Sequence, residues 1–174
     1  ILTEEVHRLI NDIVWTRNED FRQFIEADYT FVDDSLAAVY GVDAPGGTWA
    51  QATLPAEQNR AGFLTSAAFS TRNSHLQSNS TTRRGQYIQQ RFLCFSVPPP
   101  PADVVPEIPE PPGEPMTLRD LMEQIHLEEA SCASCHKYLD PYAFPLENFD
   151  AIGAFRTVEP NGLPIDPVVE IDNW

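Results

Sequence analysis

A dense run of prolines constrains this chain more than any other feature of its sequence. Nine of the 16 prolines lie between positions 98 and 115, four of them in succession at 98–101. Each proline fixes φ and removes a backbone donor, so the interiors of helices and central strands exclude such a segment. We therefore expect residues 98–116 to form a proline-rich strap or linker. It would separate a helical N-terminal part, residues 1–97, from a C-terminal part, residues 117–174.

Helical periodicity dominates the rest of the chain. Apolar residues at helical spacing predict a first helix from Thr3 and a second that starts at Asn18. A third short helix over residues 35–40 is predicted after an Asp33 or Asp34 cap, and Gly41 ends it. Further helices are predicted over residues 83–95, 117–125 and 146–155, whereas residues 42–55 and 70–82 read as loop. The fold class is therefore mainly α, loop-rich and proline-rich.

The C-terminal part contains a motif with specific chemistry. Cys132, Cys135 and His136 spell C-x-x-C-H, the attachment signature of a c-type haem. The two thiols can each form a thioether to one covalently bound haem c, and His136 can be the proximal iron ligand. A Cys3His zinc site that adds Cys94, or a redox disulfide, are the alternatives. We expect a haem-containing, cytochrome c-like C-terminal part.

The composition limits the partners of the chain. A net charge of −15 argues against nucleic acid, whose phosphates need Lys and Arg, and suits a redox partner protein or a larger assembly. No apolar run is long enough for a membrane span. Haem attachment to C-x-x-C-H takes place outside the cytoplasm in bacteria. The motif therefore predicts an exported protein, periplasmic or extracellular, processed or cut from a longer precursor.

The sixth iron ligand is the open question in the haem interpretation. No methionine follows His136, so the arrangement of the common small cytochromes c is not expected. His75, in a polar loop, and His126, on the helix before the motif, are the candidate distal ligands. His7, the two methionines, water and an open site are the other candidates. Arg84 and Arg156 are among the arginines that could pair with haem propionates.

An ordered set of short stretches resembles a known family. It comprises Ala27–Val32 leading to Tyr40–Gly41, Arg84–Gly85 before a helix and the proline run, the C-x-x-C-H motif, Leu139–Pro141 and Leu146–Gly153. Together they resemble the planctomycete-type cytochrome c family of uncharacterised exported domains, also common in myxobacteria. The resemblance implies that the chain is the C-terminal portion of such a protein. It also implies that Cys132, Cys135 and His136 bind haem, and it adds weight to His75. Leu139 stands where many relatives have methionine.

These observations lead to one expected function and two alternatives. We expect electron transfer outside the cytoplasm by a haem c protein that is a module or subunit of a larger redox protein or assembly. The first alternative is a haem enzyme module, peroxidase-like or oxidase-like, with an open iron site. The second is a zinc-stabilised interaction module.

Overall fold

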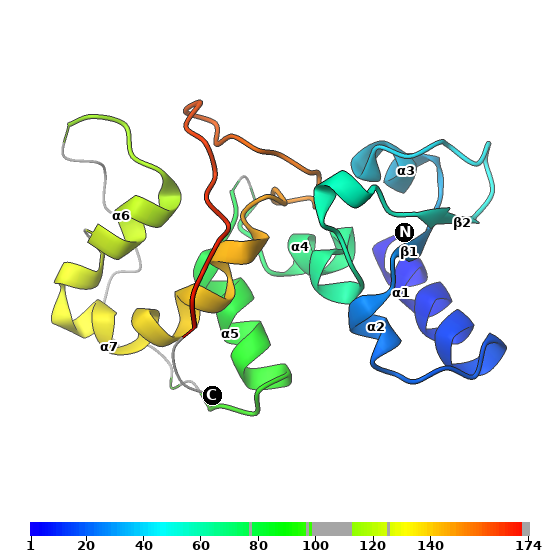
Figure 1. The fold of residues 1–174 in the computed structure, drawn as a ribbon, viewed down its shortest axis with the longest axis horizontal. Helices are drawn as coiled ribbons and strands as arrows, with labels where there is room; N and C mark the ends of the chain where they lie inside the picture. The colour runs from blue at the N-terminus through cyan, green and yellow to red at the C-terminus, as the bar shows by residue number, and fades with distance from the viewer. Residues whose placement is uncertain (77, 97, 99–112, 125, 172–174) are drawn as a thin grey trace. The chain divides into compact units, whose positions relative to one another are not determined.

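The structure is a computed structural model that describes residues 1–76, 78–96, 98, 113–124 and 126–171 (Figure 1). In these residues the chain is mainly helical and loop-rich, with one two-stranded sheet, which confirms the predicted secondary-structure class. It divides into two compact units. Unit 1 comprises Ile1–Asn79 and Phe149–Phe155, and unit 2 comprises Ser80–Asn148 and Arg156–Trp174. In the part described, no helix has both the length and the apolar character needed to cross a membrane.

Unit 1 contains four α-helices, a turn of π-helix, two 3₁₀ turns and the sheet. In chain order these are α1 (Leu2–Ile10), η1 (Asn11–Thr16), α2 (Gln23–Glu26), β1 (Tyr29–Val32), α3 (Asp34–Tyr40), β2 (Ala50–Thr53), η2 (Ala56–Gln58), η3 (Phe63–Thr65) and α4 (Ala67–Arg72).

Helix α3 is the element that sequence reasoning located best. The Asp33 side chain accepts a hydrogen bond from the Leu36 N–H at 2.9 Å, as an N-cap residue should. Gly41 ends the helix with φ of 68°, a left-handed conformation that costs glycine little. The predicted cap and the predicted end are both confirmed.

Two other predictions for unit 1 are wrong. Residues 42–55 are predicted as loop, but β2 lies there and pairs antiparallel with β1, Tyr29 opposite Thr53. Four residues are too few for an alternating pattern to stand out. Asn18 does not cap the second helix. It has φ of 52° and follows the π-helical turn, whereas α2 begins only at Gln23.

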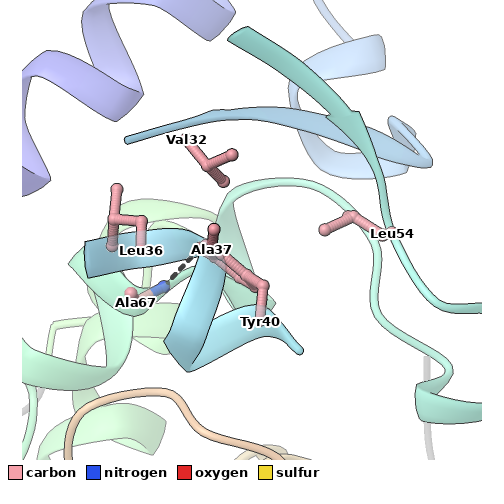
Figure 2. Close-up of a cluster of buried hydrophobic side chains, with 6 residues drawn as sticks. All are labelled: Val32, Leu36, Ala37, Tyr40, Leu54 and Ala67. Atoms are coloured by element: carbon pink, nitrogen blue, oxygen red, sulfur yellow. Dashed lines mark hydrogen bonds between the residues drawn. The ribbon is translucent and has the colours of Figure 1, made fainter. Parts of the chain in front are cut away.

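Two clusters of buried apolar side chains form the core of unit 1. One cluster of buried side chains joins α3 to β1, the Leu54 loop and α4, as Figure 2 shows: Val32, Leu36, Ala37, Tyr40, Leu54 and Ala67. A second packs α1 and η1 against α2 and the start of β1: Leu9, Ile13, Phe24, Ala27 and Tyr29. Such burial is the main favourable contribution to folding.

Unit 2 is built from three α-helices and three 3₁₀ turns in the residues described. They are α5 (Thr81–Arg91), α6 (Leu118–Gln124), η4 (His126–Glu128), α7 (Ala130–Leu139), η5 (Asp140–Tyr142) and η6 (Phe144–Leu146). Ser80 caps α5 by accepting from the Arg83 N–H, and Thr117 accepts from the Asp120 N–H at 3.0 Å, which confirms the predicted cap of α6.

The grouping of the elements differs from the sequence-based division. Helix α5 lies in the predicted N-terminal part, yet it belongs to unit 2, where it packs on α7 and η5. Most of the predicted linker, residues 99–112, lies outside the described residues. The role of that segment as a boundary therefore stays a prediction.

The predicted helix over residues 146–155 is wrong. The chain there makes turns instead, because polar side chains bond the backbone locally. Asn148 Nδ2 donates to the Arg156 carbonyl at 2.9 Å, and Asp150 Oδ1 accepts from the N–H groups of Ile152 and Ala154, each at 2.9 Å.

Candidate functional site

The C-x-x-C-H motif lies in the middle of α7. The helix begins after Glu129, whose carboxylate accepts hydrogen bonds from the Ser131 N–H and hydroxyl. Residues three and four apart share a helix face, so Cys132, Cys135 and His136 lie on one side of α7. These three side chains are half-buried, whereas Ser131, Ser134 and Lys137 are exposed. The motif therefore occupies the inner face of its helix.

Both thiols of the motif are free. Cys132 and Cys135 form no disulfide, and neither does the exposed Cys94. The hydroxyl groups of Ser131 and Ser134 lie 3.9 and 3.7 Å from the sulfur atoms of Cys132 and Cys135. Two unpaired thiols one helical turn apart are what covalent attachment to a planar cofactor requires.

The His136 ring is fixed by a residue one turn further along. Its Nδ1 lies 3.1 and 3.3 Å from the two carboxylate oxygens of Asp140. Asp140 is buried, with 2% of its surface exposed. Its backbone N–H also donates to the His136 carbonyl at the end of α7. Asp140 therefore holds His136 through both its side chain and its main chain.

Helix α5 supports this end of α7. Thr82 Oγ1 lies 3.4 Å from His136 Nδ1, and Gln89 Nε2 donates to the Tyr138 carbonyl. Between them, a Cβ added at Gly85 would lie 2.0 Å from the Leu139 carbonyl oxygen. Only glycine lets the backbone of α5 approach that closely. Thr82, Gly85 and Gln89 are three and four residues apart, so one face of α5 aligns the residues around His136.

Buried charged groups hold the segment that follows. Arg84 is fully buried, and its Nη1 donates to the Leu146 carbonyl at 2.8 Å. The Glu147 carboxylate, 3% exposed as a residue, pairs with Arg156 at 3.2 Å and accepts from Thr81 Oγ1 at 3.5 Å. Arg84 and Arg156, the sequence-based candidates for propionate binding, thus bind groups of the chain itself. The family stretch at residues 146–150 has a structural role.

The candidate distal ligands are placed only in part. His75 is exposed, in a loop of unit 1 that an isolated bridge between Ser74 and Asn79 closes; its N–H donates to the Ser78 carbonyl at 2.9 Å. His126 starts the η4 turn of unit 2, and its side chain lies outside what is described. His7 is exposed on α1, and Met122 is buried in α6. The assignment of His75 or His126 to the iron stays a prediction.

A second buried polar cluster lies in unit 1, around Glu5. Thr30 Oγ1 donates to Glu5 Oε1 at 3.0 Å, and the Tyr40 hydroxyl donates to the same oxygen. Burial raises the pKa of the Glu5 carboxyl above its ordinary value. Arg60 lies over the Tyr40 ring, 4.6 Å from its centre, and burial lowers the pKa of Arg60 to about 10.

Sequence reasoning identified the motif but missed the residues that hold it. Thr82 and Gln89 had no assigned role, and Gly85 and Asp140 were noted only as part of the family pattern. The spacing of Asp140 carries a signal, because it stands four residues after His136 at the end of a helix. The partners on α5 lie about 50 residues earlier in the chain and have no local signal. In the part of the chain that is described, no group of three or more His, Cys, Asp or Glu side chains could hold a metal ion.

Comparison with known proteins identifies two families along the chain. Residues 1–42 match PSD4, "Protein of unknown function (DUF1592)". Residues 60–159, which include the whole motif and Asp140, match PSCyt3, "Protein of unknown function (DUF1588)". The matched segments share the core of unit 1, where the Ala67 N–H donates to the Tyr40 hydroxyl at 2.8 Å (Figure 2).

No curated protein and no solved structure matches the chain. The family matches confirm the resemblance at the level of planctomycete cytochrome-like domains of unknown function. Because the second match extends over more than half of the 174 residues, the chain belongs to the PSCyt3 family, DUF1588.

Proposed function

We propose that this chain is a haem c protein that transfers electrons outside the cytoplasm, as a module or subunit of a larger redox protein or assembly. One observation carries the proposal: Cys132, Cys135 and His136 share the half-buried face of α7, with both thiols free and Nδ1 of His136 held by Asp140. A bound haem would supply an iron that cycles between ferrous and ferric states.

The donor set fits a haem better than it fits zinc. A structural zinc site needs four ligands that converge on one ion. The described residues offer no group of three such side chains. A c-type haem requires fewer metal ligands from the protein than a structural zinc ion does. Cys132 and Cys135 would bind its edge, and of the motif only the His136 imidazole would bind the metal. The chain's own residues then supply attachment, ring orientation and burial.

A haem enzyme module with an open iron site is the second candidate. The sequence favours it in one respect, since no methionine follows His136 to bind the far side of the iron. The two candidates make the same use of Cys132, Cys135 and His136. They differ in whether a side chain or a small molecule occupies the sixth position.

Mass and absorbance measurements test the proposal together. The chain, exported through a pathway that attaches haem c, should gain the mass of one haem and resist alkylation at Cys132 and Cys135. The double variant Cys132→Ser/Cys135→Ser should lose the haem. Cys94→Ser is the matched control and should keep it, because Cys94 is exposed and far from the motif in sequence. A chain no heavier than its amino acids, with all three thiols reactive, would refute the proposal.

The absorbance of the loaded protein separates the candidates. Electron transfer predicts a low-spin spectrum that carbon monoxide does not change, and an open site predicts a high-spin spectrum that it does. His75→Ala and His126→Ala should then be compared, with His7→Ala as the control on α1. If His75 or His126 binds the iron, its replacement converts the spectrum to high spin.

A further inference from the structure

The environment of His136 carries an inference that rests on the proposed function and extends it. We propose that Asp140 is a positioning residue: its carboxylate accepts a hydrogen bond from the Nδ1–H of His136, fixes the imidazole ring, and sets the basicity of the nitrogen that would bind the iron. The contact joins Nδ1 to Asp140 Oδ2 at 3.1 Å and to Oδ1 at 3.3 Å.

The chemistry of the pair determines which nitrogen carries the proton. An ionised carboxylate only accepts hydrogen bonds, so Nδ1 must be the donor. A neutral imidazole carries one proton, which leaves the lone pair on Nε2. The Thr82 hydroxyl, 3.4 Å from Nδ1, can accept from the same N–H. The surroundings thus select the Nδ1–H tautomer, the form that presents Nε2 to a metal.

Burial and backbone hydrogen bonds restrain the His136–Asp140 pair. The Asp140 side chain is 3% exposed and that of His136 is 19% exposed, so water competes little for this contact. The main chain of Asp140 is held at both ends: its N–H donates to the His136 carbonyl, and its carbonyl accepts from the Ala143 N–H at 2.9 Å. Pro141 follows directly and fixes the next φ. The backbone that carries the carboxylate is therefore held on both sides of Asp140.

A carboxylate on the second nitrogen alters the metal-binding nitrogen. It raises the basicity of the imidazole, and removal of such a partner typically costs 10- to 100-fold in metal affinity or activity. A more basic ligand stabilises the ferric form relative to the ferrous form. Asp140 should therefore lower the midpoint potential of the haem, and loss of its charge should raise it.

The first test needs no haem. The chain with Cys132→Ser/Cys135→Ser, labelled with ¹⁵N at histidine, is studied by long-range ¹H–¹⁵N correlation at a pH where the rings are neutral. His136 should show the Nδ1–H tautomer. Asp140→Asn should lose this preference, while the signals of His7 and His75 stay unchanged. A His136 ring in the Nε2–H form overturns the inference, whether or not the protein binds haem.

The second test uses the loaded protein. Potentiometric titration should show Asp140→Asn with a potential raised by about 59 mV, which corresponds to a tenfold change in the one-electron equilibrium constant. Glu147→Gln is the matched control, because Glu147 is a buried carboxylate of the same unit that pairs with Arg156 instead of His136. An unchanged potential in Asp140→Asn, or an equal rise in Glu147→Gln, would contradict a specific role for Asp140.

The two tests can refute the proposed function and the role of Asp140 independently of each other. If the exported chain carries no haem, the proposed function fails and the tautomer measurement still decides the role of Asp140. If haem is attached and the His136 ring proves to be Nε2–H, the proposed function stands and the role of Asp140 is refuted.

Discussion

The two units are stabilised by different kinds of contact. In unit 1, two clusters of buried apolar side chains join helices, strands and loops. Unit 2 also buries apolar residues, among them Leu121, Leu139 and Phe144, but the contacts around its motif helix include several buried polar and backbone groups. Gly85 lies against the Leu139 carbonyl, Arg84 donates to the Leu146 carbonyl, and Asp140 and Glu147 are buried with His136 and Arg156.

This difference predicts how much the stability of each unit depends on a bound cofactor. A unit with its own apolar core can fold without a ligand. A small unit held by a few close contacts around a half-buried motif gains most from added apolar surface, because small domains bury too little of their own. A haem on α7 would add that surface. On the proposed function, the cofactor should stabilise unit 2 more than unit 1.

The largest expected effect is in unit 1. Phe69 is fully buried and makes an edge contact with Phe63, ring centres 5.7 Å apart. Phe69→Ala should lower the free energy of unfolding by about 3–5 kcal/mol, since it leaves a cavity. Hydrogen exchange measured by segment should rise in residues 1–79.

Phe21→Ala is the control for this substitution, because Phe21 is 59% exposed in the same unit. It should cost far less. Equal losses in the two variants would show that the apolar core of unit 1 is not its main support.

A smaller effect, confined to unit 2, is expected from Gly85→Ala. The added methyl group would overlap the Leu139 carbonyl, so α5 and α7 must separate. We expect a loss of about 1–3 kcal/mol, the usual cost of overpacking. Exchange should rise in residues 80–96 and 126–148, and the yield of haem attachment should fall.

Gly113→Ala is the matched change, because a Cβ at Gly113 meets nothing within 4 Å. It should leave stability and attachment unchanged. If Gly85→Ala behaves like Gly113→Ala, the close approach of the two helices does not support the motif.

The smallest expected effect is a pH dependence in unit 1. Burial raises the pKa of Glu5 above its ordinary 4.5, so the folded form holds this proton more tightly than the unfolded form. Its stabilising contribution is fully present below pH 4.5 and is lost as pH rises through the folded pKa. Glu5→Gln cannot ionise. Its stability relative to the wild type should therefore increase as the pH rises above 4.5.

Urea denaturation at a series of pH values measures this difference. Glu4→Gln is the control, because Glu4 is exposed in an ion pair with Arg8 on the same helix. A Glu5→Gln difference that does not change with pH would show that Glu5 gains no proton on folding.

Local signals in the sequence predicted much of the fold. Asp33, Gly41 and Thr117 act through bonds to residues three or four positions away, so short patterns reveal them. The β1–β2 pairing was not predicted because its strands are separated by 17 residues and each is only four residues long. The turns at residues 146–155 were not predicted because Phe149, Ile152 and Phe155 have the spacing of an apolar helix face. The side chains of Asn148 and Asp150 instead form hydrogen bonds with nearby backbone groups.

The candidate site was predictable to a similar degree. The identity and spacing of Cys132, Cys135 and His136 locate the candidate site without knowledge of the fold. Their supporting residues do not. Thr82 and Gln89 are ordinary helix-surface types, and only the close approach at Gly85 brings them to α7. Asp140 was predictable only in part: its spacing in the sequence suggests contact with His136, but nothing in the sequence indicates that it is buried.

The course of the chain has a consequence for biosynthesis. Residues Phe149–Phe155 belong to unit 1, although they follow the motif in sequence. Arg60 donates to the Gly153 carbonyl at 2.7 Å, and its guanidinium lies 4.4 Å from the centre of the Phe149 ring. A nascent chain therefore cannot complete the N-terminal unit before the segment with Cys132 and Cys135 has been synthesised. Both thiols are therefore synthesised while the unit ahead of them is still unfinished.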